Sequence, residues 1–145
     1  MPPITVSADV DRPASVVYAY ATDPSRFAEW QRGVVSGHLE GGDGPGARCV
    51  TVRRIGFADR ASTSHLVRAE PPGSWAVRGI DGPIRAAVDV RVEPLGAESS
   101  RVTIAVDFEG RGIGKVLVPL AVRRQARREM PANIAELKRR LEGTG

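Results

Sequence analysis

Two segments in the middle of the chain alternate strictly between apolar and polar residues, and this alternation limits the fold more than any other feature. In the first segment, charged residues separate Val88, Val90 and Val92. In the second, the apolar positions are Val102, Ile104, Val106 and Phe108. A period of two is typical of antiparallel strands with one buried and one solvated face. We therefore expect these apolar side chains to face the interior. The residues expected in solvent are Asp89, Arg91, Arg101 and Asp107.

Other strand-like segments precede these two, and one long helical pattern follows them. The predicted strands cover residues 4–10, 34–39, 48–55, 61–69, 75–80, 88–92 and 102–108. After Gly110, Gly112 and Gly114 the apolar residues recur with helical spacing, at Val116, Leu117, Leu120, Met130, Ile134, Leu137 and Leu141. Strands followed by a helix predict an α+β fold, in which an antiparallel sheet of about six to seven strands packs on one C-terminal helix. We find no linker or repeat, so we expect one domain over residues 1–145.

The stretch ATDPSRFAEW, residues 21–30, predicts a corner between two short helices after the first strand. Asp is a favoured N-cap residue, and proline suits the first position of a helix. Asp23-Pro24 therefore ends a helix that starts near Pro13 and begins another. Phe27 and Trp30, three residues apart, are expected to share the buried face of the second helix.

The charge of the chain is concentrated near its end. The net charge is +4, and the clustered cations are Arg123, Arg124, Arg127, Arg128, Lys138, Arg139 and Arg140. No aromatic residues interleave these arginines to stack on bases. We therefore expect a solvated helix face and no nucleic-acid partner.

The cysteine content and the hydropathy pattern narrow the class of protein. The single cysteine, Cys49, can form no internal disulfide and suits a reducing cytoplasm. No apolar run is long enough to span a bilayer, and we identify no signal peptide or metal-ligand cluster. We expect a cytoplasmic protein without a membrane span, bound metal or cofactor.

The element order, the stretch PASVVYAYATDPSRFAEW and the terminal NIAELKRRLEG together resemble the START-like (SRPBCC) helix-grip superfamily over nearly the whole chain. Its polyketide cyclase/dehydrase-like branch is the most similar. The resemblance implies a curved antiparallel sheet wrapped around the C-terminal helix, with two short helices closing the sheet. It also implies a cavity between sheet and helix for an apolar or amphipathic molecule, lipid-like or polyketide-like.

We expect the cavity to be lined by residues of the strands, the second short helix and the C-terminal helix. These are Trp30, Val50, Val52, Ser62, Ser64, Leu66, Trp75, Val88, Val90, Ile104, Val106, Leu120, Arg123, Arg127 and Ile134. A helical wheel places Arg127 near the centre of the apolar stripe. Two interpretations of Arg123 and Arg127 follow. Either an arginine reaches into the cavity to hold an anionic oxygen, or it passes the sheet edge or pairs with a sheet carboxylate.

Alternation places Ser62, Ser64 and Leu66 on one face of their strand and His65 on the other. In aromatase-cyclase members of the family, the corresponding strand carries Ser-His-Arg with the Ser and Arg in the cavity. Here Leu66 stands in place of that arginine, and no Ser–His or His–carboxylate constellation is evident, so no catalytic residue is assigned.

The leading hypothesis is a protein that binds a small apolar or amphipathic molecule. The alternative is a cofactor-independent cyclase, dehydratase or aromatase that uses Arg127 or Ser64 with cavity water. A third hypothesis is a protein-interaction module of the same fold. The sequence is compatible with a homodimer and leaves the identity of the ligand open.

Overall fold

The computed structural model describes residues 3–55, 57–81, 84–110 and 117–143. The elements in chain order are β1 (Ile4–Val10), α1 (Ala14–Ala21), the 3₁₀ turn η1 (Pro24–Arg26), α2 (Phe27–Trp30), β2 (Val34–Glu40), β3 (Arg48–Ile55), β4 (Ala58–Glu70), β5 (Ser74–Gly79), β6 (Ile84–Gly96), β7 (Ser99–Gly110) and α3 (Leu117–Gly143). The α+β prediction is confirmed. The predicted positions Gly112, Gly114 and Val116 lie outside the described residues.

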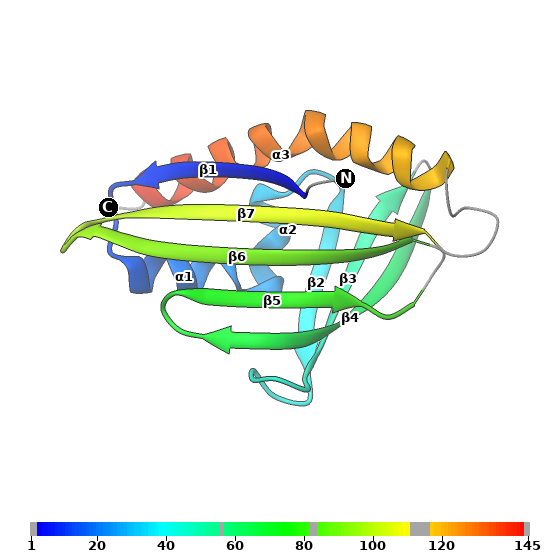
Figure 1. The fold of residues 1–145 in the computed structure, drawn as a ribbon, viewed down its shortest axis with the longest axis horizontal. Helices are drawn as coiled ribbons and strands as arrows, with labels where there is room; N and C mark the ends of the chain where they lie inside the picture. The colour runs from blue at the N-terminus through cyan, green and yellow to red at the C-terminus, as the bar shows by residue number, and fades with distance from the viewer. Residues whose placement is uncertain (1–2, 56, 82–83, 111–116, 144–145) are drawn as a thin grey trace.

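All seven strands belong to one antiparallel sheet with the order β1-β7-β6-β5-β4-β3-β2. The sheet curves, and α3 lies alongside β1 and β7, while α1 packs on β6 and β7 (Figure 1). The strands β4 and β6 each have 13 residues and are longer than the alternation predicted. Strands of this length allow the sheet to bend around the helices while each strand stays paired.

The central strands present the predicted apolar face to the interior. Val90, Val92, Val102 and Ile104 are buried, and Val88, Val106 and Phe108 are half-buried on the same face. On the outer face, Arg91 and Arg101 are exposed, as predicted. Asp89 is half-buried on the outer face, where it pairs with Arg68. Asp107, which was expected in solvent, instead pairs with the buried Arg123 of α3. The period-two alternation therefore identified the buried face of β6 and β7 correctly.

The Asp23-Pro24 corner forms as predicted, although its first turn is a 3₁₀ turn. The Asp23 carboxylate accepts a hydrogen bond from the backbone N–H of Ser25 at 3.0 Å, and Pro24 is the first residue of η1. Phe27 and Trp30 are both buried, with ring centroids 5.9 Å apart, and Phe27 also meets Trp75 of β5 edge-on at 6.2 Å. The corner thus directs two aromatic rings of α2 onto the sheet.

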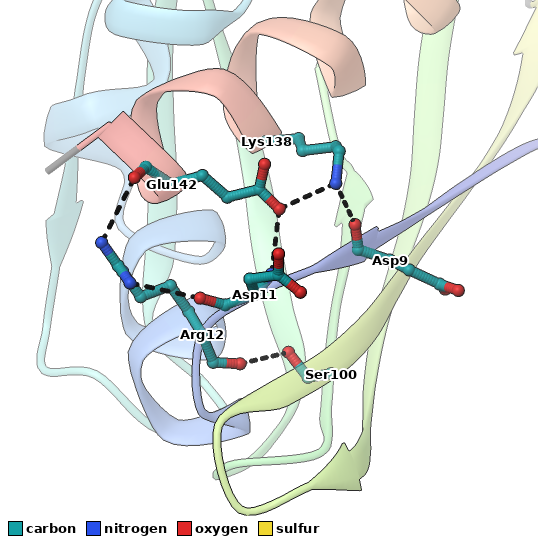
Figure 2. Close-up of polar contacts among 6 residues, drawn as sticks. All are labelled: Asp9, Asp11, Arg12, Ser100, Lys138 and Glu142. Carbon is teal, nitrogen blue, oxygen red and sulfur yellow. Dashed lines mark hydrogen bonds and ion pairs between the residues drawn. The ribbon is translucent and has the colours of Figure 1, made fainter. Parts of the chain in front are cut away.

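A polar network ties the end of α3 to the segment that joins β1 to α1 (Figure 2). The Glu142 carboxylate accepts hydrogen bonds from the backbone N–H of Asp11 at 2.9 Å and from Lys138 Nζ at 2.7 Å. Lys138 also donates to the carbonyl of Asp9 at 2.6 Å, and Arg12 donates to the carbonyl of Glu142 at 3.3 Å. These bonds hold the C-terminal turn of α3 against β1.

Replacing Glu142 with alanine should therefore lower the free energy of unfolding by about 1 kcal/mol at pH 7, because a charged hydrogen bond between distant segments is lost. Glu136 is the matched control. Its carboxylate pairs only with Arg139 and Arg140 of the same helix among the described residues, so Glu136→Ala should lower the free energy of unfolding by less than Glu142→Ala does. Urea denaturation followed by circular dichroism measures both values, and equal losses would contradict the proposed role of Glu142.

The same site gives a pH dependence. The hydrogen bonds from Lys138 and from the Asp11 N–H hold the pKa of Glu142 below its ordinary value of 4.5. A carboxylate whose pKa is lowered in the folded state stabilises that state above the unfolded pKa. Its contribution is lost as the pH falls through the folded pKa. The stability difference between the wild type and Glu142→Gln should therefore shrink between pH 6 and values below 4.5, and a constant difference would contradict this.

Candidate functional site

The register of β3 and β4 shows which of their residues face the interior. Ala47 and Cys49 are buried, and Cys49 pairs with Ser64 on β4. Further along, the hydroxyls of Thr51 and Ser62 lie 3.2 Å apart, so both side chains are on this inner face. The same register places Arg53 of β3 opposite Arg60 of β4, again on the inner face.

The prediction that Val50 and Val52 line the interior is wrong. Both lie on the outer face of β3, where Arg54 pairs with Asp59 at 2.8 Å. The residues from Cys49 to Val52 are apolar or small on both faces, so alternation alone did not identify the inward set. Because Ala47 and Cys49 pack in the core, the odd-numbered residues of β3 face inward. A shift of the strand by one residue would exchange its inner and outer faces.

The strands β6 and β7 supply an apolar wall on the same inner face. Ala86 pairs with Phe108, and Val88 pairs with Val106. All four side chains are half-buried, whereas Val90 and Ile104, further along the same strands, are buried. The interior is therefore packed near α1 and α2 and incompletely covered towards the start of β6. We call the incompletely covered set the open inner face: Thr51, Arg53, Arg60, Ser62, Ser64, Ala86, Val88, Val106 and Phe108.

Arg53 has an unusual environment within the open inner face. Its side chain is exposed, yet burial among surrounding protein atoms lowers the pKa of its guanidinium, and the nearby Glu129 opposes that shift. Arg53 also donates a hydrogen bond to Gln31 Oε1, which follows α2, at 3.3 Å. Because Glu129 belongs to α3, this helix passes near the β3 side of the sheet.

The arginines of α3 do not take the predicted positions. Arg127 is exposed, so its predicted place at the centre of the inward stripe is wrong. The inward face of α3 instead runs through Arg123, Ala126, Met130, Ile134, Leu137 and Leu141. Arg123 is buried and pairs with Asp107 at 2.6 Å, which corresponds to the interpretation in which an arginine pairs with a sheet carboxylate. Leu120 is exposed as well.

The other predicted lining residues divide into two groups. Ser62, Ser64, Val88 and Val106 belong to the open inner face. Deeper in the molecule, packed within the core, lie Trp30, Leu66, Trp75, Val90, Ile104 and Ile134. Sequence reasoning missed Thr51, Arg53, Arg60, Ala86 and Phe108 as members of the open inner face. Taking Cys49 as an inward-facing core residue would have placed Thr51 and Arg53 on the same face, because alternate residues of a strand share a face.

The reactive side chains that the sequence singled out are placed away from one another. His65 of β4 is exposed on the outer face, opposite Arg78 of the neighbouring strand β5. Burial raises the pKa of the Cys49 thiol to about 11, so this thiol stays protonated at neutral pH. Among the described residues, no three His, Cys, Asp or Glu side chains come together to hold a metal ion, and no helix is apolar enough over its length to cross a membrane.

The seven-stranded curved sheet, the long C-terminal helix and the two short helices after β1 define a helix-grip protein. The match of the sequence to a protein family supports the same class. The chain belongs to the family described as "Polyketide cyclase / dehydrase and lipid transport", whose sequence profile matches residues 1–142.

Solved structures share the fold at low sequence identity. A START superfamily protein from Mycobacterium smegmatis has a TM-score of 0.80 and 12% identity, with 100% of each chain covered. The Zhui aromatase/cyclase from Streptomyces sp. R1128 has a TM-score of 0.73 and 17% identity, with 99% of this chain and 97% of that chain covered. The di-domain aromatase/cyclase BexL, of the BE-7585A biosynthetic pathway, has a TM-score of 0.74 and 19% identity. The match covers 95% of this chain and 45% of BexL, so the chain spans about half of that protein. A comparison with curated protein sequences found no match.

Proposed function

We propose that the protein binds a small apolar or amphipathic molecule against the open inner face, beneath the first half of α3. The observation that carries this proposal is the incomplete burial of Ala86, Val88, Val106 and Phe108 on the inward side of the sheet. Apolar surface left in water forgoes about 25 cal/mol per Å² of stabilisation, which an apolar ligand recovers by covering it. The description of the family, which includes polyketide cyclases and lipid transport, supports a ligand of this kind.

The position of α3 supports the same proposal. Arg123 attaches the helix to β7 through Asp107, and Glu129 lies near Arg53 of β3. The helix thus passes from the β7 side of the curved sheet towards its β3 side. A ligand on the open inner face would lie between these two attachments, with apolar residues on one side and hydroxyl groups on the other, an arrangement typical of small-molecule sites.

The alternative of a cyclase that uses Ser64 gains no support from the neighbours of this serine. Across the two adjacent strands, Ser64 pairs with Cys49 and Gly79. Glycine has no side chain, and the Cys49 thiol is protonated at neutral pH. Neither residue can act as the general base that an activated serine requires.

Binding can be tested with N-phenyl-1-naphthylamine, a neutral apolar dye that becomes fluorescent in apolar surroundings. We expect saturable binding to the wild type. The substitution Ser62→Trp should weaken it at least tenfold, because an indole on the open inner face occupies the volume of the dye. The matched control is Ala61→Trp, which adds the same side chain at the next residue but on the outer face of β4. Equal affinities of the two variants, or no binding to the wild type, would contradict the proposed function.

A further inference from the structure

Two arginines face each other across neighbouring strands on the open inner face. Arg53 of β3 and Arg60 of β4 are direct partners in a ladder without register shifts. The Thr51–Ser62 hydroxyl contact, two residues away on each strand, establishes the face on which both arginines lie. The hydrogen bond from Arg53 to Gln31 is consistent with this, because Gln31 follows α2, whose aromatic residues pack inside the sheet.

This pair of cations is incompletely neutralised. Like charges directly opposite each other on a sheet are destabilising. Among the described residues, Glu129 is the acidic group that acts on Arg53, while Arg60 makes no hydrogen bond or ion pair with them. The outer face of the same two strands differs, because there Arg54 directly faces Asp59 and pairs with it at 2.8 Å. The inner pair therefore leaves about one positive charge without a counterion from the described part of the chain.

We infer that Arg53 and Arg60 bind the anionic group of the ligand, so that the ligand is an amphipathic anion whose apolar body lies on Val88, Val106 and Phe108. Guanidinium groups donate several hydrogen bonds in a planar arrangement that suits carboxylate, phosphate and sulfonate oxygens. The hydroxyls of Thr51 and Ser62 offer further donors beside the arginines. Through Val77 of β5, Val88 is level with Leu66, which lies six residues from Arg60 along β4. The arginines and Val88 are therefore about 20 Å apart along the sheet, and the curvature of the sheet shortens this distance through space. This inference rests on the proposed function and specifies the class of ligand.

The test uses two dyes that share one skeleton. The neutral dye is N-phenyl-1-naphthylamine, and the anionic dye is 8-anilinonaphthalene-1-sulfonate, which differs from it by one sulfonate group. Affinities are measured by fluorescence titration for the wild type, Arg53→Met and Arg60→Met. The control is Arg48→Met, which removes the same charge from an exposed position on the outer face of β3. Thermal melts followed by circular dichroism establish that each variant is folded.

We expect the affinity for the sulfonate dye to fall about tenfold in each inner-face variant, which corresponds to the loss of one charged hydrogen bond. The affinity for the neutral dye should change less than about twofold, and Arg48→Met should change neither affinity by more than that. An unchanged affinity for the sulfonate dye, or an equal loss for both dyes, would overturn the inference and leave the proposed function intact. Failure of the neutral dye to bind the wild type would instead reject the proposed function.

A measurement on the wild type keeps the inference testable even if an inner-face variant does not fold. Raising the ionic strength screens charged interactions that solvent reaches. The affinity for the sulfonate dye should therefore decrease with added sodium chloride, while the affinity for the neutral dye should not. Parallel salt responses of the two dyes would overturn the role of the two arginines.

Discussion

Replacing Trp30 with alanine should lower the free energy of unfolding by about 3–5 kcal/mol, the loss typical of a large aromatic side chain removed from a core. Trp30 is 5% exposed and meets Phe27 edge-on, and Phe27 in turn meets Trp75 of the sheet. Truncation at Trp30 thus leaves a cavity where α2 packs on the rest of the molecule. The measurement is urea denaturation followed by circular dichroism, since the substitution removes one of the two tryptophans.

The control for Trp30→Ala is Phe57→Ala, because Phe57 is a fully exposed aromatic residue whose removal should change stability by less than about 0.5 kcal/mol. A second variant separates packing from polar effects. The indole Nε1 of Trp30 is buried and has no hydrogen-bond partner among the described residues. Trp30→Phe removes this unsatisfied donor and should therefore cost less than half of the loss in Trp30→Ala. A loss below about 1 kcal/mol in Trp30→Ala would show that Trp30 is not a packed core residue.

The substitution Gly37→Ala should destabilise the protein by about 2–3 kcal/mol through overpacking. A Cβ atom at Gly37 would lie 2.5 Å from the carbonyl oxygen of Pro24 and 3.1 Å from its carbonyl carbon. Both atoms belong to the backbone of η1, so no side-chain rotation relieves the contact. Either β2 or the Asp23-Pro24 corner must move, and both carry residues of the core.

Gly44→Ala is the matched control for this substitution. Gly44 has no atom within 4 Å of a Cβ built on it and no positive φ, so alanine there should change stability by less than about 0.5 kcal/mol. Urea denaturation of both variants at one pH provides the comparison. If Gly37→Ala were as stable as Gly44→Ala, the close approach of η1 to β2 would not exist in solution.

Local patterns predicted the elements well because local interactions dominate them. The alternation of Val88 to Val92 and of Val102 to Phe108 predicted both the strands and their buried face, because a strand places successive side chains on opposite sides. Asp23 and Pro24 predicted the corner, because an N-cap and a fixed φ act within a few residues. The order of strands and helix then predicted the α+β class.

Tertiary packing decided the positions where two local patterns fit equally well. In β3, Val50 and Val52 on one face competed with Cys49 and Thr51 on the other, and contact with the core selected Cys49 and Thr51. In α3, the wheel placed Arg127 on the inward face, whereas packing places its neighbour Ala126 there. The two residues differ by about 100° in helical phase, and the rotation of the whole helix decides which of them faces the sheet.

The approach of Arg53 to Arg60 also depends on the tertiary structure alone, because it follows from the pairing of two strands. Nothing in the sequence around either arginine specifies the other as its partner. Similarly, Arg123 and Asp107 are far enough apart in sequence that only the docking of α3 on β7 brings them together. The elements, and the buried faces of the strongly alternating strands, follow from the sequence, since they depend on backbone periodicity. The three-dimensional structure decided the open inner face, since its members come from separate strands that meet only when the sheet closes around the helix.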